Sequence, residues 1–184
     1  KGAPYLLCDP DQHTRLRTIY QSEGSKKPLV GLAWHSGRDQ VGWQKTIPLK
    51  FWEPILRRSD VTFVSLQYGD HEQEIQGANA AFGCNIISDP AVDSLKNMES
   101  FAAQVAAMDL VISNSNTAAH MAGALGIPAW SLIPREGSGG LLWYWFNTGS
   151  QSMWYDSMTV YRQTSWRDWS DLINRVATDL NAFL

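Results

Sequence analysis

Short apolar runs alternate with amphipathic stretches along most of the chain after residue 28. The runs are nearly continuous in apolar residues and too short for helices, which is typical of strands that are covered on both faces. The predicted strands lie at residues 29–34, 61–66, 85–87, 109–113, 128–133 and 159–161. This alternation predicts an α/β fold with a Rossmann-like, doubly wound parallel sheet of about six strands.

The stretches between the runs carry apolar residues at helical spacing. The predicted helices lie at residues 51–58, 72–82, 98–107 and 117–125. Gly83 and Gly126 follow two of these helices, and glycine suits the left-handed conformation in which many helices end. Pro54 fits only the first turn of a helix or a kink.

The two ends of the chain depart from this alternation. Residues 1–28 predict a linker with one short helix at residues 11–19. Residues 166–184 predict a carboxyl-terminal amphipathic helix, so the central domain spans residues 29–165. Because the chain begins at Lys1 and not at Met, we expect it to be a piece of a longer protein.

The composition excludes several classes of protein. The chain has 184 residues, 44% of them hydrophobic and 18% charged, with a net charge of −3, as in ordinary globular domains. There is no dense basic run for a nucleic acid and no apolar stretch of about 20 residues for a membrane span. Cys8 and Cys84 are interpreted as reduced thiols, which predicts a cytoplasmic protein.

Tryptophan is unusually abundant. Six of the nine fall in the last third of the chain, namely Trp130, Trp143, Trp145, Trp154, Trp166 and Trp169. A small core does not hide so many large rings completely. Some of them therefore face a ligand, another domain or a partner, or else they cover the edge of the sheet.

In an open parallel sheet, ligands bind beyond the carboxyl ends of the strands. Residues 113–120 join a predicted strand to a predicted helix there, and the backbone N–H groups and dipole of such a helix end can receive a phosphate. Alternatively, Ser115 or Asn116 serves only as a helix cap. His120, about one turn into the helix, is close enough to reach a diphosphate, although a lone helical histidine is more often a packed or surface residue.

The loop after the first strand, at residues 34–46, is longer than ordinary α/β connections, and such loops are usually functional. Ser36, Arg38 and Lys45 offer a hydroxyl and two cations that suit a phosphate group. The alternative is that these charges only make the surface soluble.

Two further loops follow the second and third predicted strands. Residues 67–69, which begin with Gln67, and residues 88–93 could frame a base and a ribose, since an acidic residue accepts hydrogen bonds from sugar hydroxyls.

Metal and nucleophilic catalysis have little support. The four histidines form no HxH or HxxxH pair, no cysteine lies beside one, and there is no GxSxG elbow.

At these residues the chain resembles a known family. It is similar to the carboxyl-terminal half of glycosyltransferases related to family 9, the heptosyltransferase-like group, in the form often fused behind tetratricopeptide repeats in bacteria. The segments that carry the resemblance are residues 4–6, 30–34, 45–49, 65–69, 108–113, 117–130, 154–158 and 161–163. Each string is weak by itself, and it is their order and spacing over most of the chain that make the resemblance specific.

The resemblance implies a GT-B architecture, in which two Rossmann-like domains face each other and the second holds most of the nucleotide-sugar. This chain resembles the second domain, so the expected partners are an amino-terminal domain and tetratricopeptide repeats. Asn116, Thr117 and His120 would contact the diphosphate of the donor, and Ser36 and Lys45 would neutralise its phosphates. No metal or separate cofactor is expected, because a helix dipole and cationic side chains stabilise the departing diphosphate in this fold.

The chain also departs from the family pattern. The family usually has Asp at the position of Ser115, so either the donor sugar differs or activity has been lost. The acidic general base normally belongs to the amino-terminal domain, so no catalytic residue is expected here. If it lies in this chain after all, Asp39, Asp70 and Asp89 are the first candidates.

The leading hypothesis is therefore the donor-binding domain of an inverting, metal-independent glycosyltransferase, one that transfers no sugar by itself. A non-catalytic module that binds a protein or a glycan through exposed tryptophans is the first alternative. A sugar-nucleotide epimerase on the same fold is the second.

Overall fold

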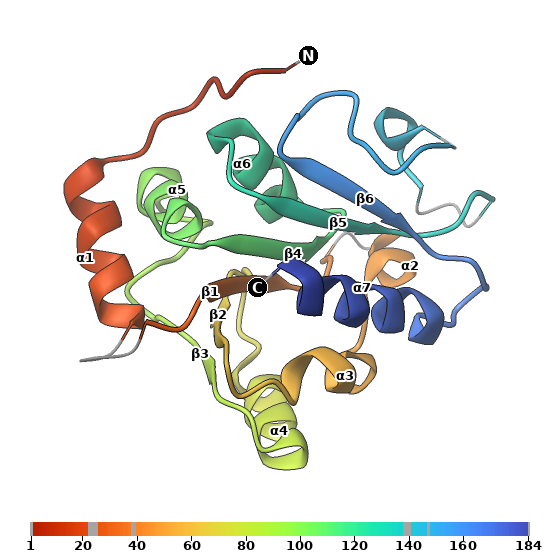
Figure 1. Cartoon of the computed structure of the whole chain (residues 1–184), viewed down its shortest axis with the longest axis horizontal. Coiled ribbons are helices and arrows are strands. Elements are labelled where there is room, and N and C mark those ends of the chain that lie inside the picture. The colour runs from red at the N-terminus through yellow and green to blue at the C-terminus, as the bar shows by residue number, and fades with distance from the viewer. Residues whose placement is uncertain (1, 22–25, 38–39, 138–140, 147, 184) are drawn as a thin grey trace.

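The computed structural model describes residues 2–21, 26–37, 40–137, 141–146 and 148–183 (Figure 1). Arg38 and Asp39, two candidates from the sequence, lie outside these ranges. None of the helices in the described ranges has the length and apolar composition needed to cross a membrane.

Within the described residues, six parallel strands form a single sheet. They are β1 (Leu29–Ala33), β2 (Thr62–Ser65), β3 (Ile86–Ile87), β4 (Leu110–Asn114), β5 (Ala129–Ile133) and β6 (Met158–Arg162). Their order across the sheet is β3-β2-β1-β4-β5-β6, and every neighbouring pair is parallel. This is the strand order of the Rossmann fold, so the predicted fold class is confirmed.

Helices cover both faces of the sheet. They are α1 (Pro10–Tyr20), α2 (Gly42–Lys45), α3 (Glu53–Leu56), α4 (Glu72–Phe82), α5 (Met98–Ala106), α6 (Thr117–Leu125) and α7 (Ser170–Phe183), with 3₁₀ turns η1 (Leu49–Trp52) and η2 (Trp143–Trp145). In Figure 1, α5 and α6 lie on one side of the sheet with α1 outside α5, and α3, α4 and α7 lie on the other.

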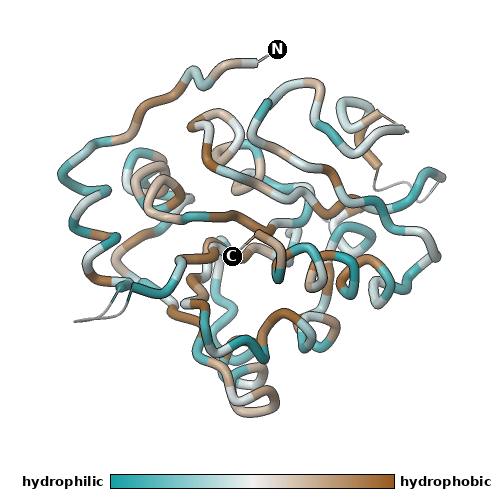
Figure 2. Tube along the Cα trace, viewed as in Figure 1, coloured by the Kyte–Doolittle hydropathy of each residue, from teal (hydrophilic) through white to brown (hydrophobic). Residues whose placement is uncertain are grey.

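The core lies in two layers because successive strand side chains point to opposite faces. In β1, Leu29 and Ala33 pack with the α1, α5 and α6 side, whereas Val30 and Leu32 pack with the α3, α4 and α7 side. All five residues of β1 are buried, as expected of a strand that is covered twice. Figure 2 shows hydrophobic residues concentrated along these central strands.

Two predicted helix ends are confirmed. Gly83 and Gly126 follow α4 and α6 with φ of 65° and 76°, in the left-handed region that glycine favours. The helix expected at 51–58 is instead the 3₁₀ turn η1 followed by the short helix α3. Pro54 lies in the first turn of α3, where its missing N–H leaves no carbonyl of the helix unpaired.

The carboxyl-terminal helix begins at Ser170, four residues later than the predicted Trp166. The intervening residues form a tight turn, in which the N–H of Asp168 donates to the carbonyl oxygen of Ser165 at 3.3 Å. Arg167 in this turn has φ of 60°, which a continuing helix does not allow. The carboxylate of Asp168 then accepts from the N–H of Ser170 and starts the helix.

Candidate functional site

The crevice of the sheet lies between β1 and β4. These strands are neighbours, with Ala33 beside Ser113, and the order of the strands reverses between them. The connections that leave their carboxyl ends therefore run in opposite directions and open a crevice, which is where ligands bind in sheets of this kind.

A cavity of about 300 Å³, the central pocket, occupies this crevice. Its lining residues are Ser36, Lys45, Leu66, Tyr68, Ser94, Leu95, Met98, Phe101, Asn116, Thr117 and Ala118. Four of the seven site residues predicted from the sequence are thus brought together, namely Ser36, Lys45, Asn116 and Thr117.

Side-chain hydrogen bonds anchor the two ends of the loop after β1 where they meet this pocket. The hydroxyl of Thr46 accepts from the N–H of Ser36 at 3.1 Å and donates to the carbonyl oxygen of Gly42 at 3.0 Å. The side-chain amide of Asn114 donates to the carbonyl oxygens of Trp34 and Lys45 at 3.0 and 2.9 Å. The backbone of Ser36 and that of Lys45 are therefore each anchored by a neighbouring side chain.

Lys45 is the last residue of α2, a helix that the sequence analysis did not predict. Its side chain is only 5% exposed, and its ammonium nitrogen lies 3.1 Å from the carbonyl oxygen of Ser115. A buried ammonium group retains its attraction for anions because little water screens it.

The amino end of α6 faces the same pocket. Asn116 is the helix cap, and its side-chain oxygen accepts from the N–H of Ala118 at 2.9 Å and from the hydroxyl of Ser113 at 2.8 Å. The capping role is therefore confirmed for Asn116. Because Thr117 and Ala118 also line the pocket, the positive end of the helix dipole lies against it.

Ser115 does not line the central pocket. It is 1% exposed, and its hydroxyl accepts from the indole N–H of Trp145 at 2.7 Å. Its backbone carbonyl, not its side chain, contributes to the site by accepting from Lys45.

His120 lies apart from the lining of the central pocket, among aromatic residues. Its ring stacks on Trp145 with centroids 5.2 Å apart, and its Nδ1 lies 3.1 Å from the hydroxyl oxygen of Tyr155. Burial lowers the pKa of His120, and the positive charge of Lys45 lowers it further. His120 thus lies close enough to Lys45 to feel its charge, but it does not line the central pocket.

A second cavity of about 440 Å³, the polar pocket, adjoins the central pocket through shared lining residues such as Leu66 and Tyr68. The loops 67–69 and 88–93, which were expected to frame a base and ribose, meet there together with Asp70. Gln67 braces this wall, since its side-chain oxygen accepts from the N–H groups of Trp34 and His35 at 3.0 and 2.8 Å.

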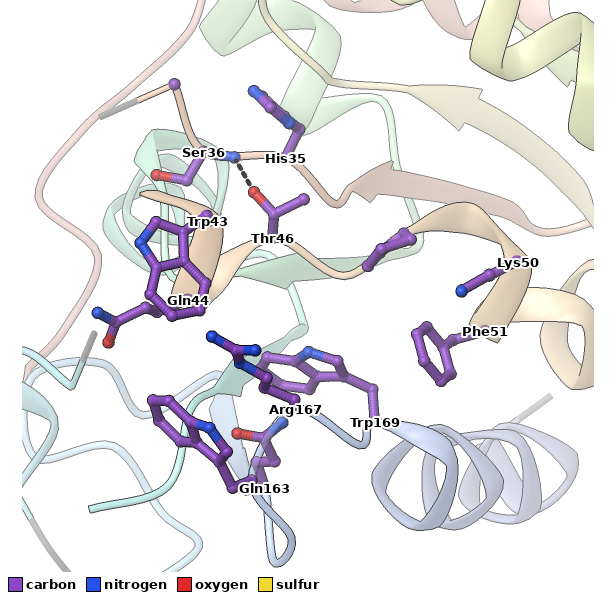
Figure 3. A pocket seen from close by; sticks show the side chains of 13 residues that line it. His35, Ser36, Trp43, Gln44, Thr46, Lys50, Phe51, Gln163, Arg167 and Trp169 are labelled. Carbon is purple, nitrogen blue, oxygen red and sulfur yellow. Dashed lines mark hydrogen bonds between the residues drawn. The ribbon is translucent and has the colours of Figure 1, made fainter. Parts of the chain in front are cut away.

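A third cavity of about 780 Å³, the aromatic cleft, was not expected from the sequence (Figure 3). Its lining residues are His35, Ser36, Gly37, Trp43, Gln44, Thr46, Pro48, Lys50, Phe51, Gln163, Trp166, Arg167 and Trp169. The number of tryptophans was the one sequence signal for it. Of the six late tryptophans, Trp130, Trp145 and Trp169 are buried, whereas Trp143, Trp154 and Trp166 are 43–76% exposed.

The chain is similar in sequence to a longer bacterial protein. The chain is 35% identical over 185 residues to protein FlbA of Caulobacter vibrioides. The match covers all of this chain but only 30% of that protein. No protein-family model matches the chain.

Solved structures of glycosyltransferases share the fold. ADP-heptose LPS heptosyltransferase II of E. coli matches with a TM-score of 0.62 and 16% identity, over 98% of this chain and 53% of that one. E. coli heptosyltransferase WaaC with ADP matches with a TM-score of 0.59 and 15% identity, over 90% of this chain and 47% of that one. The family 9 glycosyltransferase of Veillonella parvula DSM 2008 matches with a TM-score of 0.59 and 14% identity, over 86% of this chain and 42% of that one. The chain therefore has the fold of about one half of a GT-B glycosyltransferase of the family 9 type.

Proposed function

We propose that this chain binds the nucleoside diphosphate of a nucleotide-sugar and is the carboxyl-terminal, donor-binding domain of a glycosyltransferase. The observation that carries the proposal is the meeting of Ser36, Lys45 and the amino end of α6 on one pocket at the crevice of the sheet. E. coli WaaC, whose fold this chain shares, was solved with ADP, which supports a nucleotide as the ligand.

The central pocket has the chemistry of a phosphate site. The first N–H groups of a helix and its dipole attract anions, and a buried ammonium group adds a charge-assisted contact. Lys45 and Thr117 stand on its wall, and the hydroxyl-bearing Ser36 stands beside them. The adjoining polar pocket, with Asp70 and Asp89 on its wall, would take the ribose and base.

In the proposed reaction, an acceptor hydroxyl attacks the anomeric carbon of the sugar and inverts it, while the nucleoside diphosphate departs. Negative charge builds up on the departing phosphates, and Lys45 and the dipole of α6 would stabilise it without a divalent metal ion. The proton of the acceptor would go to a base on an amino-terminal domain.

Several features of the whole protein belong to this proposal. The chain spans about half or less of each solved relative and less than a third of FlbA. A whole protein of such a length would also hold an amino-terminal domain and tetratricopeptide repeats, which the proposal includes. Cys8 and Cys84 are free thiols, which favours the cytoplasm as the compartment.

A second candidate function is a non-catalytic module that binds a protein or glycan. Trp143 is 76% exposed and Trp154 43% exposed, and their rings lie edge to face with centroids 6.3 Å apart. Exposed aromatic pairs of this kind are frequent in binding surfaces. This candidate predicts no nucleotide binding.

Titration calorimetry of the 184-residue chain with ADP, UDP, GDP and CDP tests the proposal. We expect saturable binding of at least one of these nucleotides, with the same affinity in the presence of EDTA. Lack of saturable heat with all four would overturn the proposed function and favour the second candidate. Loss of binding in EDTA would overturn the metal-independent part of it.

A further inference from the structure

The aromatic cleft is assembled from parts of the chain that are far apart in sequence. Trp43 comes from α2, Phe51 from η1, and Trp166 and Trp169 from the connection between β6 and α7. Trp169 is buried at 4% exposed, whereas Trp43 and Trp166 are 50% and 44% exposed. The cleft thus combines a buried ring with two rings whose surfaces remain accessible.

Arg167 contacts the two exposed tryptophan rings of the cleft. Its guanidinium carbon lies 5.0 Å from the ring centre of Trp43 and 5.9 Å from that of Trp166. Arg167 also has φ of 60°, a backbone conformation that is uncommon outside glycine. Residues held in such conformations are concentrated at ligand sites. Figure 3 shows the guanidinium of Arg167 pointing toward the ring of Trp43.

The polar groups of the cleft are hydrogen-bond donors and amides. Lys50 and Arg167 supply cationic donors and Gln44 a side-chain amide, whereas the hydroxyl of Thr46 and the amide nitrogen of Gln163 already donate to backbone carbonyl oxygens. None of the described residues that line the cleft has a carboxylate. Aromatic faces surrounded by donors suit a sugar ring, whose C–H face packs on tryptophan and whose hydroxyl oxygens accept hydrogen bonds.

The position of the cleft agrees with this chemistry. Ser36 lines both the aromatic cleft and the central pocket, while Leu66 and Tyr68 line both the central and the polar pocket. The three cavities therefore follow one another along the carboxyl edge of the sheet, with the proposed phosphate site in the middle. A nucleotide-sugar has its nucleoside, diphosphate and sugar in the same order.

We propose that the aromatic cleft holds the sugar ring of the nucleotide-sugar, packed against the corner that Trp43 and Trp166 form, where their rings meet edge to face at 84°. This inference rests on the proposed function, because it requires the diphosphate to lie in the central pocket. A cleft of about 780 Å³ is large enough for a sugar ring.

The test compares a nucleoside diphosphate with its own sugar conjugates. Calorimetry is carried out on the wild-type chain and on Trp43→Ala, Trp166→Ala and Trp43→Phe. The ligands are UDP with UDP-glucose and UDP-N-acetylglucosamine, ADP with ADP-glucose, and GDP with GDP-mannose. Trp143→Ala is the matched control, because this exposed ring does not line the cleft. Thermal unfolding verifies that each variant is folded.

For the base that binds, we expect at least one conjugate to bind the wild-type chain about three- to tenfold more tightly than the free nucleoside diphosphate. Trp43→Ala and Trp166→Ala should remove this gain and leave the affinity for the nucleoside diphosphate unchanged. Trp43→Phe should keep part of the gain, and Trp143→Ala all of it.

The outcomes separate this inference from the proposed function. If no nucleoside diphosphate binds, both fail. If a nucleoside diphosphate binds and no conjugate binds more tightly, or the gain survives in both alanine variants, the proposed function stands and the sugar subsite is overturned. Quenching of tryptophan fluorescence by free glucose or maltose without nucleotide, in wild type but not in Trp43→Ala, would also overturn it, since the cleft would then bind an unattached glycan.

Discussion

The ammonium nitrogen of Lys45 lies 3.1 Å from the backbone carbonyl oxygen of Ser115. This hydrogen bond crosses the crevice of the sheet, from the loop after β1 to the turn that precedes α6. It fixes the cation beside the amino end of the helix, so two sources of positive potential act on the same small volume.

Replacing Lys45 with methionine removes the charge while keeping a side chain of similar length. We expect the affinity for the nucleoside diphosphate to fall by roughly 10- to 100-fold, the scale of a charge-assisted hydrogen bond. Calorimetry measures this fall. Lys26→Met is the matched control, because Lys26 lies before β1, at the opposite end of the sheet. Equal affinities for wild type and Lys45→Met would remove Lys45 from the site.

Gly42 permits the close approach of α2 to the loop after β1. A Cβ atom there would lie 2.1 Å from the carbonyl oxygen of Ser36, so Gly42→Ala must displace Ser36. We expect weaker nucleotide binding and a loss of stability of roughly 1–3 kcal/mol, the usual cost of overpacking. Gly77→Ala in α4 is the control, since a Cβ there meets no atom within 4 Å and alanine favours the helix. Wild-type affinity in Gly42→Ala would contradict this role.

Gln67 supports the backbone between two cavities. Its side-chain oxygen accepts from the N–H groups of Trp34 and His35, and Gln67→Ala leaves both donors without that partner. We expect the free energy of unfolding to fall by about 1–3 kcal/mol. Urea unfolding measures it, with Gln76→Ala on the exposed face of α4 as the control. A change no larger than that of the control would show that the backbone does not depend on Gln67.

The stability of the protein should fall on the acid side. Burial and the charge of Lys45 lower the pKa of His120 in the folded state, so the unfolded chain takes up this proton first as the pH falls below about 6.5. The free energy of unfolding then decreases until the pH reaches the folded pKa. The pKa of His35 is also lowered, mainly by burial, and acts in the same direction.

His120→Gln tests this pH dependence. We expect the loss of stability between about pH 7.5 and about pH 5.5 to be smaller in His120→Gln than in the wild type, because one of the two histidines no longer titrates. Urea unfolding at both pH values gives the difference. The same loss in variant and wild type would show that His120 does not cause it.

The sequence predicted the sheet well because its strands are short, continuous apolar runs. Residues 29–34 and 128–133 appear as β1 and β5 with ends within one residue. The loops of the crevice were predictable for a general reason, since the carboxyl ends of adjacent parallel strands meet at one edge. Hence Ser36 and Asn116 were expected close together, and both line the central pocket.

The aromatic cleft could not be predicted in this way. Trp43 and Trp166 belong to segments with no shared local pattern, and only the packing of α2 against the turn after β6 brings them together. The orientation of the His120 ring also could not be predicted from the sequence. Its position in the helix was known, but Trp145 and Tyr155, which hold its ring, come from irregular segments.

The hydrogen bond between Trp145 and Ser115 has a consequence for how this site can change over time. The hydroxyl of Ser115 is enclosed and already bonded to the indole N–H, so a larger or charged side chain there has no space unless Trp145 moves. Loss of Trp145 alone would remove both the stacking on His120 and the hydrogen bond to Ser115. Substitutions at these two positions should therefore arise together among homologues, and an aspartate at position 115 should be accompanied by a different residue at position 145.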